Sequence, residues 1–208
     1  MPAALLLPSA CTRAAPAVEF CSLKVVYQQV EGKVQAGFSF FAIVNDEDGP
    51  EDLSEMRLYN DAEGLMWLMT SDNWTVLEDR GKTWVGSKML AMSEGELLPA
   101  GQFRVSIVDK SGDTGETTFG FDTPADSPYR FPSLSVVEGD YSVRSSYPDN
   151  YLLMYYQDGS YRSLLKLANL EGTLASLRLP SDVYGLALWA DDSGKAVSAL
   201  TGKSYIRE

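Results

Sequence analysis

The chain has 208 residues, of which 45% are hydrophobic and 11% aromatic, so it can bury a packed core and is not a disordered protein. Asp and Glu number 29 against 17 Lys and Arg, which gives a formal charge of −12. A surface of that sign repels phosphate backbones and anionic headgroups, so we expect no nucleic-acid partner. After the N-terminus, no stretch approaches the roughly 18 consecutive apolar residues of a membrane-spanning helix.

Histidine is absent from the sequence. Its absence removes the commonest general base, the commonest metal ligand and every Ser-His or Cys-His nucleophile pair. Two cysteines cannot build a thiolate zinc cage. A glycosidase could work without histidine by using two carboxylates about 5–9 Å apart, one protonated and one ionised. The acidic residues here gather in turns, where exposure to water keeps their pKa values close to the usual ones. We therefore predict a non-enzyme with no catalytic residues, no metal site and no cofactor.

The stretch LLLPSAC, residues 5–11, places small residues directly before Cys11. It resembles the lipobox of bacterial lipoproteins, in which the cysteine is acylated and becomes the first mature residue. Pro8 departs from the usual leucine, and the apolar stretch is short with no preceding Lys or Arg, which a start site placed too late would explain. We predict lipidation of Cys11, export, and a lipid anchor in the periplasm or at the cell surface. The alternative is a chance cysteine in a poorly ordered terminus, with or without a bond to Cys21.

We interpret residues 1–19 as a signal remnant followed by a tether. The segment TRAAPAVE, residues 12–19, consists largely of small residues and proline, which cannot pack a core. Cys21 begins an alternating apolar stretch, so we expect a small buried hydrophobe on a strand and not a reactive thiol.

Residues 20–123 alternate apolar and polar side chains, with turn residues every 8 to 12 positions or so. This pattern predicts an antiparallel β-sandwich of the immunoglobulin or fibronectin type. Strands are expected over 34–44, 56–59, 103–107 and 117–121. The segment LMWLM, residues 65–69, is apolar on both faces and predicts a central or covered strand. Residues 70–87 are predicted as an irregular crossover between sheets.

The proline-flanked segment PADSP, residues 124–128, predicts a domain boundary. After it, residues 129–208 predict a smaller β-rich unit with hairpins over 133–143 and 151–167. The second hairpin should turn at Asp158 and Gly159. Further strands are expected over 174–180 and 185–190 and at the C-terminus. A unit of this size has a marginal core, so we expect it to pack on the first domain.

Three acidic segments could bind calcium: 45–52, 109–113 and 190–192. In the segment DKSGD a glycine precedes the second aspartate, and no glutamate stands twelve places from Asp109, so an ordinary hairpin turn is the favoured reading. Calcium stays a minor alternative to the prediction of no metal.

Four tryptophans could stack on sugar rings or contact a protein partner. Trp67 and Trp189 lie within apolar stretches, so we assign them to the core. Trp74 and Trp84 have polar neighbours, so we predict that these two lie on a ligand or partner surface.

The segments DNW (72–74), WVGS (84–87), LPAGQFRVSIVD (98–109) and ALW (187–189) resemble a family of uncharacterised exported lipoproteins from spirochaetes, the treponemes. The resemblance implies an immunoglobulin-like first domain and a periplasmic or surface lipoprotein. It implies no activity.

Export, sandwich patterning and the missing histidines together predict a non-catalytic, lipid-anchored envelope protein that binds or scaffolds another envelope protein. The alternative is a carbohydrate-binding module for peptidoglycan or a surface glycan.

Overall fold

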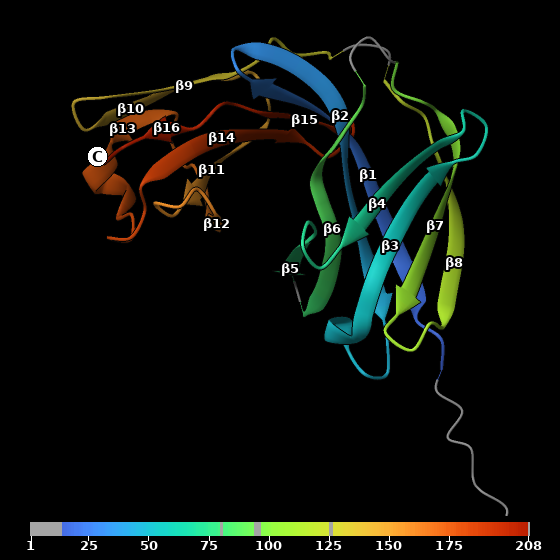
Figure 1. Ribbon diagram of the computed structural model, residues 1–208. Helices are drawn as coiled ribbons and strands as arrows, with labels where there is room; N and C mark the ends of the chain where they lie inside the picture. Colours follow the sequence, from blue (N-terminus) through green and yellow to red (C-terminus); the bar gives the residue numbers. More distant parts are fainter. Residues whose placement is uncertain (1–13, 80, 94–96, 125–126, 208) are drawn as a thin grey trace, which may run out of the picture. The chain divides into compact units, whose positions relative to one another are not determined.

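A computed structural model of the protein describes residues 14–79, 81–93, 97–124 and 127–207 (Figure 1). These residues form β-strands and two short 3-10 helices, with no α-helix among them, which confirms the all-β class. The strands are β1 (Ala17–Val30), β2 (Lys33–Asn45), β3 (Leu53–Asn60), β4 (Leu65–Thr70), β5 (Thr75–Asp79), β6 (Lys82–Ala91), β7 (Gly101–Asp109), β8 (Thr114–Phe121), β9 (Ser133–Val137), β10 (Asp140–Arg144), β11 (Asp149–Tyr155), β12 (Tyr161–Lys166), β13 (Glu171–Thr173), β14 (Gly185–Asp192), β15 (Val197–Leu200) and β16 (Ser204–Tyr205).

The strands form three sheets. The largest follows the order β12-β11-β14-β15-β1-β2-β6-β5, with β16 paired to β14, and the others follow the orders β4-β3-β7-β8 and β13-β10-β9. The described residues group into two compact units: unit 1 takes those of 1–21, 42–86 and 102–119, and unit 2 takes those of 22–41, 87–101 and 120–208. The predicted domain limits at 20–123 and 129–208 stay a prediction.

Unit 1 is an antiparallel sandwich whose core follows the predicted alternation. Met56 and Leu58 of β3 are fully buried, as are Phe103 and Ile107 of β7. Strand β3 pairs with β7 in a register that sets Met56 opposite Ile107. Burial of alternate residues on adjacent strands gives this sheet one apolar face.

The crossover predicted for residues 70–87 is wrong, because these residues form the β5–β6 hairpin. The two strands pair antiparallel, with Val76 opposite Val85 and Leu77 opposite Trp84. Gly81 lies in the turn with a φ of 73°, a left-handed conformation that glycine adopts without steric cost. The many polar residues around Trp74 and Trp84 obscured the alternation of side chains that is typical of a strand.

The covered position predicted for residues 65–69 is also wrong, because β4 lies at the edge of its sheet. Met69 is buried, but Met66 and Leu68 on the opposite face are 52% and 46% exposed. The described chain therefore covers one face of this apolar strand and leaves the other open to solvent.

Unit 2 contains the predicted hairpins β9–β10 and β11–β12, the second with its turn at Asp158 and Gly159. The strand predicted over 174–180 is wrong, since Leu174–Leu177 form a 3-10 helix. The Thr173 side chain accepts a hydrogen bond from the Ser176 N–H and caps this helix. A main apolar cluster of the unit consists of Tyr141, Val143, Tyr147, Leu152, Met154, Leu167, Val183, Leu186, Leu188, Ala190, Val197 and Ala199.

Strand β1, the first of the chain, and strand β15, near its C-terminal end, pair in parallel, with Val25 opposite Val197. A partly buried ionic network spans the same region. The Lys24 ammonium donates to both oxygens of Asp191, at 2.8 and 3.0 Å, and the Ser198 hydroxyl donates to Asp191 at 2.5 Å. Asp191 is 6% exposed and Ser198 fully buried. The network therefore joins β1, β14 and β15 through one carboxylate.

Removing that carboxylate should destabilise the protein strongly. We expect Asp191→Ala to lower the free energy of unfolding by about 2 kcal/mol, because it removes the carboxylate that pairs with the Lys24 ammonium and leaves the buried Ser198 hydroxyl without its acceptor. The control Lys82→Ala breaks the exposed pair with Glu19 and should cost less than about 1 kcal/mol. Urea unfolding measures both, and equal losses would contradict this role of Asp191.

Gly37 of β2 is required for close packing. A Cβ built on this residue would lie 2.5 Å from the Leu90 carbonyl oxygen and 2.7 Å from the Met89 methyl carbon. Gly37→Ala should therefore cost about 1–3 kcal/mol of stability. Around Gly120 nothing lies within 4 Å of such a Cβ, so Gly120→Ala is the matched control and should change stability by less than about 0.5 kcal/mol. Thermal unfolding measures both variants. The same midpoint temperature for Gly37→Ala and Gly120→Ala would show that Gly37 is not tightly packed.

Candidate functional sites

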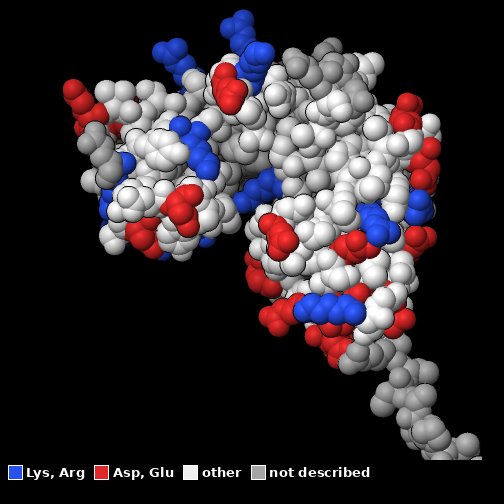
Figure 2. All heavy atoms as spheres, in the orientation of Figure 1, with Lys and Arg blue, Asp and Glu red and all other residues white. Residues whose placement is uncertain are grey.

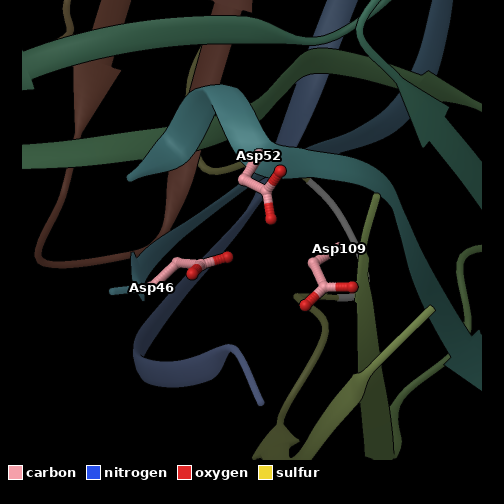
Figure 3. Close-up of side chains that lie close together, drawn as sticks. All are labelled: Asp46, Asp52 and Asp109. Carbon is pink, nitrogen blue, oxygen red and sulfur yellow. The ribbon is translucent and has the colours of Figure 1, made fainter. Parts of the chain in front are cut away.

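Three aspartates from two loops of unit 1 converge on one place (Figure 3). Asp46 follows β2, Asp52 ends the 3-10 helix η1 (Pro50–Asp52), and Asp109 ends β7. One carboxylate oxygen from each lies within 4.8 Å of the others. The backbone N–H of Lys110 donates to the Asp52 carbonyl oxygen at 2.8 Å, which holds the two loops together. Residues 45–52 and 109–113, two of the three acidic segments that the sequence offered for calcium, therefore lie side by side.

The cluster concentrates negative charge. Asp109 is 4% exposed, and its Oδ1 accepts a hydrogen bond from the Asp113 N–H at 2.9 Å. The Oδ2 of Asp46 is buried and has no hydrogen-bond donor among the described residues. Within the described ranges, no Lys or Arg forms an ion pair with any of the three aspartates. Oxygen ligands in this arrangement suit a hard cation such as Ca²⁺.

Acidic side chains are frequent around this cluster. Figure 2 shows them gathered at the end of unit 1 where β7 and β8 are joined. Like charges that close together repel, and salt screens that repulsion only in part. The prediction that the chain holds no metal stays a prediction.

The third acidic segment, residues 190–192, has a structural role in unit 2. Asp191 belongs to the network with Lys24. Asp192 accepts hydrogen bonds from the Tyr129 hydroxyl at 2.5 Å and from the Gly194 N–H at 2.9 Å. The hydrogen bond from Tyr129 is the main cause that lowers the pKa of Asp192. Both carboxylates are occupied inside the fold, which does not favour a cation site here.

Trp74 and Trp84 lie on the β5–β6 hairpin region of unit 1. Trp84 is half-buried, and the Phe20 ring packs edge-on against it, with centroids 5.7 Å apart. Trp74 is half-buried too, and its backbone N–H donates to the Thr70 carbonyl oxygen. The predicted role of both residues as a ligand or partner surface stays a prediction.

A pocket of about 530 Å³ opens on unit 2. It is lined by Tyr156, Gln157 and Asp158 from the β11–β12 turn, and by Asp182 and Tyr184 from the segment before β14. The sequence indicated the turn at Asp158 and Gly159. Gln157, Asp182 and Tyr184 were missed, because only the pairing of β11 with β14 brings the two segments together.

The two cysteines differ in what the structure describes. Cys11, the predicted lipidation site, lies outside the described residues. Cys21 on β1 is a free, half-buried thiol, and burial raises its pKa to about 11. Very little thiolate forms at neutral pH, which fits the interpretation of Cys21 as an unreactive hydrophobe. Among the described residues, no helix has the length and apolar character to cross a bilayer.

No family model matches the chain, and no curated protein matches it in sequence. Among solved structures, it is similar to Tp47, the 47-kilodalton lipoprotein of Treponema pallidum, at 10% identity and a TM-score of 0.41, over 93% of this chain and 52% of that one. Dimeric latent PorU from Porphyromonas gingivalis matches at 12% identity and a TM-score of 0.37, over 90% and 20%. Murine CEACAM1b matches at 11% identity and a TM-score of 0.26, over 88% and 98%. The chain thus spans about half of Tp47 and a fifth of PorU, and likenesses this distant carry no argument about role.

Neutralising one aspartate of the cluster should stabilise the protein in metal-free buffer. We expect Asp46→Asn to raise the free energy of unfolding by about 1 kcal/mol, because it removes one of three mutually repelling charges. Asp72→Asn, at an exposed turn position, is the control and should have little effect. Denaturant unfolding in EDTA measures both, and a destabilised Asp46→Asn protein would contradict the electrostatic interpretation. Repeating the measurement with calcium chloride tests whether the cluster takes a cation.

Proposed function

We propose that the protein is a non-catalytic, lipid-anchored component of the bacterial envelope that binds or scaffolds another envelope protein through the edge strand β4. The observation that carries this proposal is the exposure of Met66 and Leu68 on a strand that is apolar on both faces. A strand of that composition is normally covered on both sides. A partner protein would supply the missing cover.

The backbone of β4 supports the same proposal. Strand β4 pairs with β3 along one edge, and it ends the sheet order β4-β3-β7-β8 on the other. An edge strand presents N–H and C=O groups that a strand of another protein can pair with. Backbone pairing would provide affinity, and the side chains of Met66 and Leu68 would provide specificity.

The neighbours of these two residues also fit a protein interface. Tyr59 stands opposite Met66, and the Arg104 guanidinium lies 4.0 Å from the centre of the Tyr59 ring. Arg104 is paired with Asp61 at 3.0 Å, and Arg57, opposite Leu68, is paired with Glu55. Met, Tyr and Arg are enriched at protein interfaces. Because each arginine is already paired with a carboxylate, a protein that covers this face would not have to bury an unpaired charge.

The placement in the envelope rests on the N-terminal sequence. Residues 5–11 resemble a lipobox, and residues 12–16 would link an acylated Cys11 to strand β1. The resemblance to treponemal lipoproteins points to the same compartment. Attachment to the membrane by lipid would hold β4 near other envelope proteins at high effective concentration.

Charges placed on the β4 face should abolish partner binding. The variant Met66→Lys/Leu68→Lys puts two ammonium groups on the exposed apolar face, so a partner that covers it must desolvate them. We expect the recovery of one envelope protein in detergent co-purification to fall about tenfold or more. Quantitative mass spectrometry of the co-purified proteins measures this recovery.

The control for that experiment is Val137→Lys, which charges an apolar position on β9 that is 61% exposed, somewhat more than Met66 and Leu68. It should recover the same partner as the unmodified protein. If the β4 variant and the control recover every protein equally, β4 is not the binding surface. If no protein is enriched by the unmodified chain, the scaffolding role is wrong.

A further inference from the structure

We infer that the pocket of unit 2 lined by Tyr156, Gln157, Asp158, Asp182 and Tyr184 binds an uncharged saccharide. This second site is independent of the β4 face, since none of its residues belongs to unit 1. The site is an open depression of about 530 Å³, which is large enough to seat a sugar ring against the surface. The ligand class follows from the rigidity, the rings, the charge balance and the free polar atoms of the pocket.

The two segments that line the pocket are held firmly. In the β11–β12 turn, the Tyr156 N–H donates to the Ser160 carbonyl oxygen, and the Gly159 N–H donates back to the Tyr156 carbonyl oxygen, both at 3.0 Å. On the other side, the Tyr184 N–H donates to the Tyr155 carbonyl oxygen at 2.9 Å. Val183, between the two lining residues Asp182 and Tyr184, is fully buried. Binding to such a site costs little ordering of the backbone.

Two tyrosine rings supply the apolar part of the site. Tyr156 is 38% exposed, and Tyr184 is partly exposed. An exposed aromatic ring is an apolar face with a hydroxyl at its tip, so it can pack against the C–H face of a sugar ring while the hydroxyl stays hydrogen-bonded. A ligand that offers only polar groups would not use these rings.

The charges around the pocket are balanced. The Arg162 Nε donates to Asp182 Oδ1 at 2.9 Å. The Ser160 N–H and hydroxyl both donate to Asp158 Oδ1, at 2.8 and 2.6 Å, and these bonds are the main cause that lowers the pKa of Asp158. Lys203 adds a nearby positive charge: its ammonium donates to the Gly159 carbonyl oxygen at 2.8 Å. Two carboxylates are thus offset by two cations, which favours a neutral ligand over a charged one.

The remaining polar atoms match a polyol. The hydrogen bonds from Ser160 and Arg162 reach the Oδ1 atoms of Asp158 and Asp182, so the Oδ2 atoms of these exposed carboxylates are placed to accept from ligand hydroxyls. The Gln157 carboxamide is exposed and offers donors as well as an acceptor. The formal charge of −12 on the whole chain further disfavours anionic glycans. Neighbouring hydroxyls on a neutral sugar ring present the donors and acceptors that this set requires.

Saturation-transfer difference NMR tests the inference on the full chain. The neutral probes are maltotriose, cellotriose, mannotriose and triacetylchitotriose, and the charged probes are sialyllactose and spermidine. Each is used at about 1 mM, so that a complex with a Kd as weak as about 1 mM is detected. We expect signal from at least one neutral trisaccharide. Tyr156→Leu removes an exposed ring and should weaken that binding about tenfold, whereas Tyr156→Phe keeps the ring and should retain most of it.

The control variant is Tyr205→Leu, which removes a tyrosine that is 67% exposed and does not line the pocket, and it should bind like the unmodified protein. Binding of spermidine or sialyllactose alone, or of none of the probes, overturns the inference. Neutral binding that Tyr156→Leu leaves unchanged also overturns it, because the sugar would then sit elsewhere, for example at Trp74 and Trp84. Protein co-purification through β4 is a separate measurement, so failure of one proposal leaves the other standing.

Discussion

The parallel pairing of β1 with β15 is the constraint on which unit 2 depends. It joins strands from opposite ends of the chain, and Asp191 secures it by accepting from Lys24 and Ser198. Strand β14 pairs with β15, and β11 pairs with β14, so β15 fixes the position of β14 and β14 fixes the position of β11. The pocket lies at the end of this series, because the register that sets Tyr155 opposite Gly185 brings the two lining segments together. Removing one partner of this partly buried ion pair is costly, so the pair favours this strand arrangement over alternatives more than it adds to overall stability.

Strand β4 shows that a wrong prediction can carry functional information. The apolar residues on both faces of residues 65–69 indicated a covered strand, and the described chain covers only the Met69 face. An exposed apolar edge is a liability for a protein that stays alone, because it invites pairing with other chains. Such an edge is expected where a partner occupies it, which links the composition of β4 to the proposed scaffolding role.

Local patterns predicted most of the fold. The period of two located the core residues of β3 and β7, and the Asp158–Gly159 dipeptide located a hairpin turn. Segments with mixed signals failed: residues 174–177 form a 3-10 helix because Thr173 caps it, and polar residues concealed the β5–β6 hairpin. The candidate sites needed long-range pairing. The meeting of Asp46 with Asp109, or of Gln157 with Tyr184, depends on strand register that no local pattern specifies.

The most direct test of the proposed role is photo-crosslinking in native cells with a benzoylphenylalanine at position 68. A binding edge at β4 predicts a crosslink from this position to one envelope protein, with the crosslinked peptide lying in an exposed strand of that protein. The same group at position 137 should give no such product. Absence of any crosslink from position 68, or identical products from both positions, would contradict the assignment of β4 as the binding surface.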